Sequence, residues 1–111
     1  MPWLLREGEV LAGLEVAEGA AARARGLLGR DGIEGALLIR RTRSVHTLGM
    51  RFPIDVAFCD RALRVVDTVR MEPHRVGRPR IRACCVVEAE AGAFDRWSLR
   101  PGDRLEIKGD T

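Results

Sequence analysis

The chain has 111 residues, of which 46% are hydrophobic and 32% are charged. This length predicts one domain over residues 1–111, large enough to bury a core without covalent or metal cross-links. No apolar stretch approaches the roughly 18 residues of a membrane span, and the first ten residues lack the basic and long apolar regions of a signal peptide. We therefore expect a soluble cytoplasmic protein with no membrane partner.

Positive charge is concentrated in the middle of the sequence. The net charge is +3, but residues 36–82 contain 11 Arg against four acidic residues. Such asymmetry is compatible with an anionic partner, and weak nucleic-acid binding through segment 36–82 is one hypothesis. The aromatic side chains are scattered rather than interleaved with these arginines, which favours solvated arginines over a nucleic-acid surface.

The cysteines do not predict a disulfide framework or a zinc site. Cys59, Cys84 and Cys85 are odd in number, and no CxxC motif occurs. We expect all three to act as small hydrophobic side chains. Neither a bound metal nor a cofactor is predicted.

The first third of the chain predicts a hairpin followed by one short helix. The apolar runs Trp3–Leu5 and Glu9–Val16 flank "REGE", where Gly8 can adopt a left-handed turn conformation. Strong helix formers and a stop signal at Gly29 predict a helix over Gly19–Leu28. The apolar face of this helix would carry Ala20, Ala24, Leu27 and Leu28.

The central third predicts buried strands and a second hairpin. A strand is expected to start near Gly35, and pairing is expected to resume over Val45–Leu48. Pro53–Cys59 begins with a residue that lacks an N–H group and then alternates in the period of a strand. A turn at Asp60–Leu63 leads to the return strand Arg64–Met71.

The last third predicts a loop, a long strand and a short closing strand. Glu72–Arg80 contains two prolines and a glycine, which indicates a loop, whereas Ile81–Ala89 has the pattern of a central strand that is apolar on both faces. One or two helical turns follow at Ala91–Leu99, and Arg104–Ile107 is a final strand. The predicted fold is α+β and mainly β: a single curled sheet or small barrel of about six to seven strands with one or two short helices.

Several motifs occur in an order that resembles a known family. They are "RARGLLGR" (Arg23–Arg30), "HTLGMRFPIDVAFCD" (His46–Asp60), "RVV" from Arg64, "VVEAEAG" (Val86–Gly92) and "LRPGDRLEI" (Leu99–Ile107). Together they resemble the domain of unknown function 192 family of bacteria and archaea. The resemblance implies a bacterial or archaeal, mainly β domain with a short helix near the N-terminus, and it implies no established activity.

Asp55 is the side chain in this motif that needs a partner. It faces away from Ile54 and Val56 on its strand, and an ionised carboxylate buried without a partner costs several kcal/mol. We expect an arginine tether that fixes the helix to the sheet, and the candidates are Arg25, Arg30 and Arg51. A ligand contact and a catalytic role are the alternatives.

Catalytic and metal sites are the competing interpretations. His46 lies nine residues before Asp55, so the two could form a general base, with Glu88 as a third group. A hydrolase using these residues is one alternative, although no nucleophile motif such as GxSxG is present. Glu88 and Glu90, on one strand face, could bind a metal together with Asp55, but solvated acids are the plainer explanation of their spacing.

The leading hypothesis is a non-enzymatic binding or accessory module. We expect a cleft between the helix, the Met50–Asp55 turn and the Arg75–Arg82 loop, with arginines that favour an anionic small molecule or protein partner. The predicted ligand-binding residues are Arg25, Arg30, His46, Met50, Arg51 and Asp55.

Overall fold

The computed structural model describes residues 2–109, which form a seven-stranded sheet and two short helices. The first half of the chain contains β1 (Trp3–Arg6), β2 (Glu9–Val16), α1 (Gly19–Arg25), β3 (Ala36–Arg40) and β4 (Ile54–Cys59). The second half contains β5 (Val65–Met71), β6 (Cys85–Glu90), α2 (Ala93–Trp97) and β7 (Leu105–Lys108).

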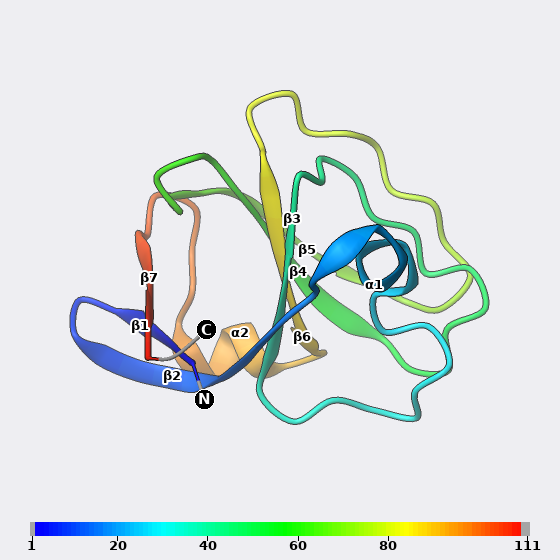
Figure 1. Cartoon of the computed structure of the whole chain (residues 1–111), viewed down its shortest axis with the longest axis horizontal. Coiled ribbons are helices and arrows are strands. Elements are labelled where there is room, and N and C mark those ends of the chain that lie inside the picture. The colour runs from blue at the N-terminus through cyan, green and yellow to red at the C-terminus, as the bar shows by residue number, and fades with distance from the viewer. Residues whose placement is uncertain (1, 110–111) are drawn as a thin grey trace.

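The sheet curls until its two outer strands meet at one end (Figure 1). Its strand order is β5-β4-β6-β3-β2-β1-β7, and all neighbours are antiparallel except β2 and β3, which are parallel. A bridge between Arg64 and Arg104 joins the starts of β5 and β7, and the Leu105 N–H donates to the Leu63 carbonyl at 2.9 Å. The mainly β α+β fold predicted from the sequence is therefore confirmed, with the curl closed at one end only.

The curled sheet has an apolar core on each face. Strand alternation sends Ala57 and Cys59 of β4 into the interior of the curl, where they pack with Leu38 of β3. The other face of β4 carries Val56 and Phe58, which belong to a second cluster beneath α1 and the loops. β4 is buried along its whole length because both of its faces are covered.

Helix α1 is shorter than predicted. It ends at Arg25 because Gly26 adopts a positive φ of 52°, and the Gly26 N–H donates back to the Ala22 carbonyl at 3.0 Å. No residue of the helix itself is buried. The predicted apolar face is wrong for Ala20, Ala24 and Leu28, which are exposed, whereas Leu27 is buried just beyond the helix.

The predicted strand Ile81–Ala89 starts four residues too early. β6 begins at Cys85, because the Ala83 N–H donates to the Arg80 carbonyl and closes a turn there. Ile81 is 85% exposed. Likewise, Val45–Leu48 contributes a single bridge, between His46 and Val76, rather than a strand. Across residues 2–109 the longest helix is far too short and polar to cross a membrane.

Candidate functional site

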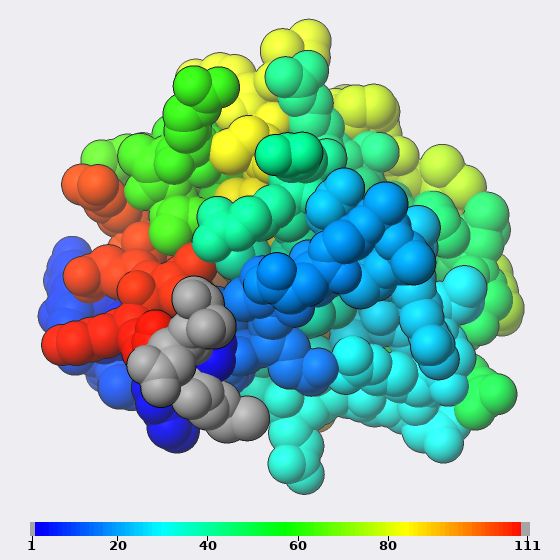
Figure 2. Space-filling view, in the orientation of Figure 1, coloured from blue at the N-terminus to red at the C-terminus, as the bar shows by residue number. Residues whose placement is uncertain are grey.

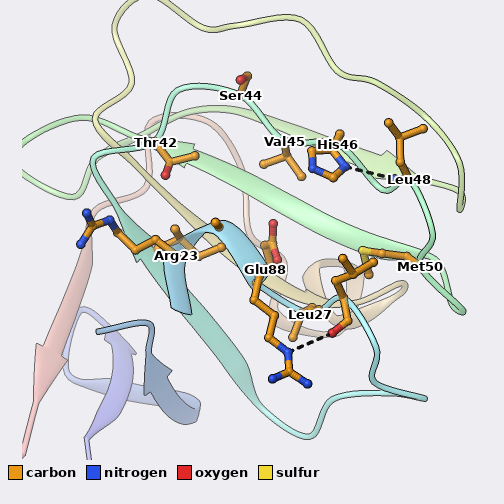
Figure 3. A pocket seen from close by; sticks show the side chains of 14 residues that line it. Arg23, Leu27, Thr42, Ser44, Val45, His46, Leu48, Met50 and Glu88 are labelled. Carbon is orange, nitrogen blue, oxygen red and sulfur yellow. Dashed lines mark hydrogen bonds between the residues drawn. The ribbon is translucent and has the colours of Figure 1, made fainter. Parts of the chain in front are cut away.

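A pocket lies between α1 and segment 42–50, above the outer face of β3 and β6 (Figure 3). Its cavity volume is about 70 Å³, which suits a ligand of a few heavy atoms. Glu88 lies between the two walls, with Arg23 and Thr42 toward one end and His46 and Met50 toward the other. In Figure 2 the blue surface that includes α1 adjoins the teal surface that follows β3.

Strand pairing puts Glu88 among apolar neighbours. On β6 it alternates with Val87 and Ala89, so its side chain is on the same face as Val86. The register places Leu37 of β3 on one side of it and Val56 of β4 on the other. The sequence therefore places a carboxyl group in the middle of an apolar sheet face.

The Glu88 side chain is largely buried and has no partner among the described residues, and its carboxyl oxygens reach solvent at the pocket. It is 4% exposed, and neither a hydrogen bond nor an ion pair joins its side chain to any part of segment 2–109. Burial disfavours the charged form and raises the pKa of Glu88 from 4.5 to about 7. Near neutral pH the group is thus able both to donate and to accept a hydrogen bond.

The end of α1 shapes one wall of the pocket. Gly26 faces Glu88, and a Cβ at Gly26 would lie 3.8 Å from Glu88 Oε1. The small residue thus leaves open the space above the carboxyl group. The half-buried Arg23 has no carboxylate within ion-pair distance in the described part of the chain. Arg25 instead donates from Nε to the Leu28 carbonyl, at 3.5 Å.

Thr47 fixes the opposite wall. It is fully buried, its hydroxyl donates to the Glu72 carbonyl at 2.6 Å, and the same oxygen accepts the Arg75 N–H at 2.9 Å. Backbone bonds between Thr47 and the segment around Arg75 add to this attachment. The neighbouring His46 accepts the Leu48 N–H at Nδ1, at 3.2 Å, so its ring is held at the rim.

The pocket includes some of the predicted ligand-binding residues and leaves others elsewhere. Arg25, His46 and Met50 line it, as does Glu88. Arg30 instead forms an ion pair with Glu15 at 2.9 Å, and Arg51 forms one with Asp31 at 2.8 Å. The expected cleft bounded by the Met50–Asp55 turn and the Arg75–Arg82 loop is displaced toward segment 42–50.

The predicted partners of Asp55 are wrong. Asp55 Oδ1 accepts from Arg70 Nε at 2.9 Å, and Oδ2 accepts the N–H groups of Gly92 and Phe94 at 2.9 and 3.1 Å. Because Asp55 lies directly opposite Arg70 in the β4–β5 register, strand pairing selects this arginine over Arg25, Arg30 and Arg51. The tether therefore joins β4 to β5 and to the start of α2, rather than to α1.

The structure does not bring His46 and Asp55 together. The side chain of Asp55 is on the same face of β4 as Ala57 and Cys59, which is the interior of the curl. His46 lies at the rim of the pocket on the outer face. The sheet separates the two side chains, so they do not form a general-base pair. Asp55 is also separated from Glu88, which leaves the three catalytic candidates without a common centre.

Glu90 does not share the environment of Glu88. It is exposed and forms an ion pair with Arg96 at 2.7 Å. Between residues 2 and 109, no group of three or more His, Cys, Asp or Glu side chains has an arrangement that could hold a metal ion.

The sequence reasoning missed Arg23, Thr42 and Thr47. Thr47 gave a usable signal, because a buried threonine in a loop usually ties down a neighbouring backbone. Arg23 gave none, since its role depends on where α1 ends relative to β6.

Comparisons with known proteins place the chain in a family. The family model DUF192, described as "Uncharacterized ACR", matches residues 4–107. A UPF0127 protein of Pyrococcus horikoshii is 32% identical over 105 residues, which cover 90% of this chain and 88% of that protein. A UPF0127 protein of Pyrococcus furiosus is 40% identical over 67 residues, or 60% of this chain and 58% of the relative.

Two crystal structures share the fold. One is a protein of unknown function from Novosphingobium aromaticivorans, with a TM-score of 0.80 and 21% identity over 95% of this chain and 82% of that one. The other is from Sinorhizobium meliloti, with a TM-score of 0.77 and 20% identity over 96% of this chain and 91% of that one. At these identities the likeness concerns the fold alone. The chain therefore belongs to the DUF192 family, whose matched relatives are uncharacterised UPF0127 proteins.

Proposed function

We propose that this domain is a binding module for a small anionic molecule, held in the pocket between α1 and segment 42–50. One observation carries the proposal: the carboxyl group of the largely buried Glu88 faces a cavity that the half-buried Arg23 also lines, and neither side chain has a hydrogen bond or ion pair within the described chain. The Glu88 oxygens open onto this cavity rather than onto other polar groups of the chain, so a molecule bound there can supply the hydrogen bonds that a largely desolvated carboxyl group needs.

The two groups define the chemistry of the ligand. Glu88 favours a hydroxyl or ammonium group that can donate to it, and the guanidinium of Arg23 favours a carboxylate or phosphate. The cavity volume of about 70 Å³ limits the buried part to a few heavy atoms. Short hydroxy acids, which are anions at neutral pH, combine these features.

A binding role is favoured over the hydrolase alternative. Hydrolysis by His46 and Asp55 requires the two side chains to act on the same substrate, and they lie on opposite faces of the sheet. The Nδ1 atom of His46 is also occupied by the Leu48 N–H. Binding makes no such demand, because Glu88 and Arg23 already line one cavity.

The proposal is tested by NMR titration of the ¹⁵N-labelled full chain with the anions glycolate, L-lactate and D-glycerate as probes. At least one is expected to shift the amide signals of Gly26, Val45 and Glu88 in a saturable way. Arg23→Gln and Glu88→Gln should each weaken binding about tenfold or more, which corresponds to loss of one charge-assisted hydrogen bond. Arg51→Gln and Glu90→Gln remove the same charges outside the pocket and should leave affinity unchanged. If no probe gives saturable shifts at the pocket, the proposal fails.

A further inference from the structure

A second feature, separate from the pocket, is the concentration of arginine at one end of the curled sheet. Residues 40–43, 60–64 and 78–82, together called the arginine end, contain eight arginines and a single acidic residue, Asp60. Figure 1 shows these three segments at the top of the molecule, and Figure 2 shows them along the upper rim in teal, green and yellow.

Backbone hydrogen bonds hold the three segments together. The Arg80 N–H donates to the Arg43 carbonyl at 2.9 Å, which joins the first segment to the third. The Thr42 N–H donates to the Cys84 carbonyl at 3.2 Å, and the Cys84 N–H donates to the carbonyl of Cys59, next to the second segment, at 2.8 Å. The arginines therefore project from one ordered surface, although they are far apart in the sequence.

Most of the positive charge at this end is not neutralised within the described chain. Arg80 forms an ion pair with Asp67, and Arg43 and Arg64 donate to the backbone carbonyls of Ala83 and Gly102. Five further arginines are exposed and have no side-chain hydrogen bond or ion pair to residues 2–109: Arg40, Arg41, Arg61, Arg78 and Arg82. Such a surface favours a polyanion.

The opposite ends of the same strands carry paired charges. Residues 31–35, which lead into β3, and residues 90–95, at the end of β6 and the start of α2, contain four acidic residues and no basic one. Three of these acids form ion pairs with arginines: Asp31 with Arg51, Glu90 with Arg96 and Asp95 with Arg70. The arginine end is therefore the more positive of the two ends, and a polyanion is steered toward it.

We propose that the arginine end binds the phosphate backbone of double-stranded nucleic acid. Five unpaired arginines exceed what a small anion can contact, whereas a duplex offers regularly spaced phosphates across the whole surface. The longest dimension of the molecule is 35 Å, so the contact covers at most about ten base pairs. Arginine forks match phosphate oxygens in geometry.

Other macromolecules fit this surface less well. A protein interface usually contains an apolar centre, and Ile81 is the one large exposed apolar side chain within the three segments. Single-stranded nucleic acid is usually bound by stacking on exposed aromatic rings. The ring at this end, that of Phe58, is fully buried, with the Arg80 guanidinium 4.2 Å from its centroid.

The test is fluorescence anisotropy of a labelled DNA duplex of about 20 base pairs, titrated with the full chain between about 20 and 200 mM NaCl. We expect binding at low salt, with log K falling linearly against log[NaCl]. One variant combines four substitutions, Arg41→Gln, Arg61→Gln, Arg78→Gln and Arg82→Gln. In this variant the slope of that line should become less steep by about 0.9 for each phosphate that an arginine no longer neutralises. A matched control removes four positive charges elsewhere, at Arg51, Arg75, Arg96 and Lys108, also by substitution with Gln.

Several outcomes would overturn the inference. One is absence of duplex binding at the lowest salt. A second is equal loss of affinity in the two variants, which would mean that net charge alone is responsible. A third is equal or tighter binding of single-stranded DNA, poly-glutamate or phosphatidylserine vesicles, which would assign the surface to a different partner. Far-ultraviolet circular dichroism and melting curves establish that both variants are folded.

Discussion

Asp55 and Glu88 lie on adjacent strands and one position apart in register, yet their side chains occupy opposite faces of the sheet. Val56 pairs with Glu88, and Asp55 pairs with Ala89. Asp55 accepts three hydrogen bonds, whereas no hydrogen bond within residues 2–109 reaches the Glu88 carboxyl. One buried carboxylate is thus a structural tether, and the other is available for a ligand.

Glu88→Gln is expected to stabilise the fold at high pH. The pKa of Glu88 is about 7 in the folded chain, against an ordinary value of 4.5. Ionisation is therefore harder in the folded state, and its cost develops between about pH 4.5 and pH 7. Above pH 7 the cost levels off at about 3 kcal/mol, whereas below pH 4.5 both states are protonated and the cost vanishes. Gln removes this cost because it cannot ionise.

Urea denaturation at about pH 5, 6, 7 and 8 measures this effect, because these values cover the range in which the cost of ionising Glu88 develops. The excess stability of Glu88→Gln over wild type should grow with pH and then level off. Glu90→Gln, at an exposed position two residues away on β6, is the matched control and should show no such rise. A constant difference across the series would contradict the assignment.

Asp55→Asn is expected to destabilise the chain at every pH above the acid range. Asn keeps one acceptor oxygen, so either the bond to Arg70 or the two bonds to the start of α2 must be lost. The expected decrease in the free energy of unfolding is about 2–4 kcal/mol, measured by urea denaturation. Arg70→Gln should have a smaller effect, because Gly92 and Phe94 still satisfy the carboxylate. If Asp55→Asn left the free energy of unfolding unchanged, the tether would not be structural.

Thr47→Val is expected to loosen the wall of the pocket. Val has a similar shape but can neither donate to the Glu72 carbonyl nor accept from the Arg75 N–H. The free energy of unfolding should fall by about 1–3 kcal/mol, and hydrogen exchange of segment 44–50 should accelerate. Thr68→Val on β5 is the control, since its hydroxyl has no hydrogen bond to the described chain. Equal exchange rates in wild type and Thr47→Val would refute this role.

The sequence was a good guide to the sheet and a poor guide to its polar partners. The alternation from Pro53 to Cys59 and the return strand after Asp60 predicted the β4–β5 hairpin, because successive side chains of a strand point to opposite faces and impose a period of two on the sequence. The partner of Asp55 could not be predicted in the same way. The choice among many arginines is made by register, which puts Arg70 opposite Asp55.

The candidate site was predictable to a lesser degree. Strand alternation treats Glu88 and Glu90 alike, and it does not reveal what covers each of them. In the structure, α1 and segment 42–50 cover Glu88, while Glu90 lies beyond their reach and is exposed. The burial that distinguishes the two residues is a tertiary property, as is the early end of α1 that brings Arg23 into the pocket wall.

Gly35→Ala is expected to disrupt the junction on which β3 depends. Gly35 has a positive φ of 76°, and a Cβ at this position would collide with the carbonyl oxygen of Gly13 on β2. This close approach immediately precedes the parallel pairing of β2 with β3, which starts at Ala36 opposite Leu14. Strain and collision together should lower the free energy of unfolding by at least about 2 kcal/mol. Urea denaturation measures this free energy as the midpoint concentration multiplied by the dependence of the free energy on urea concentration. Gly32→Ala is the matched control: its φ is not in the left-handed region, its Cβ would meet nothing within 4 Å, and its stability should equal or exceed that of wild type. If the two variants were equally stable, the approach of Gly35 to Gly13 would not limit the fold.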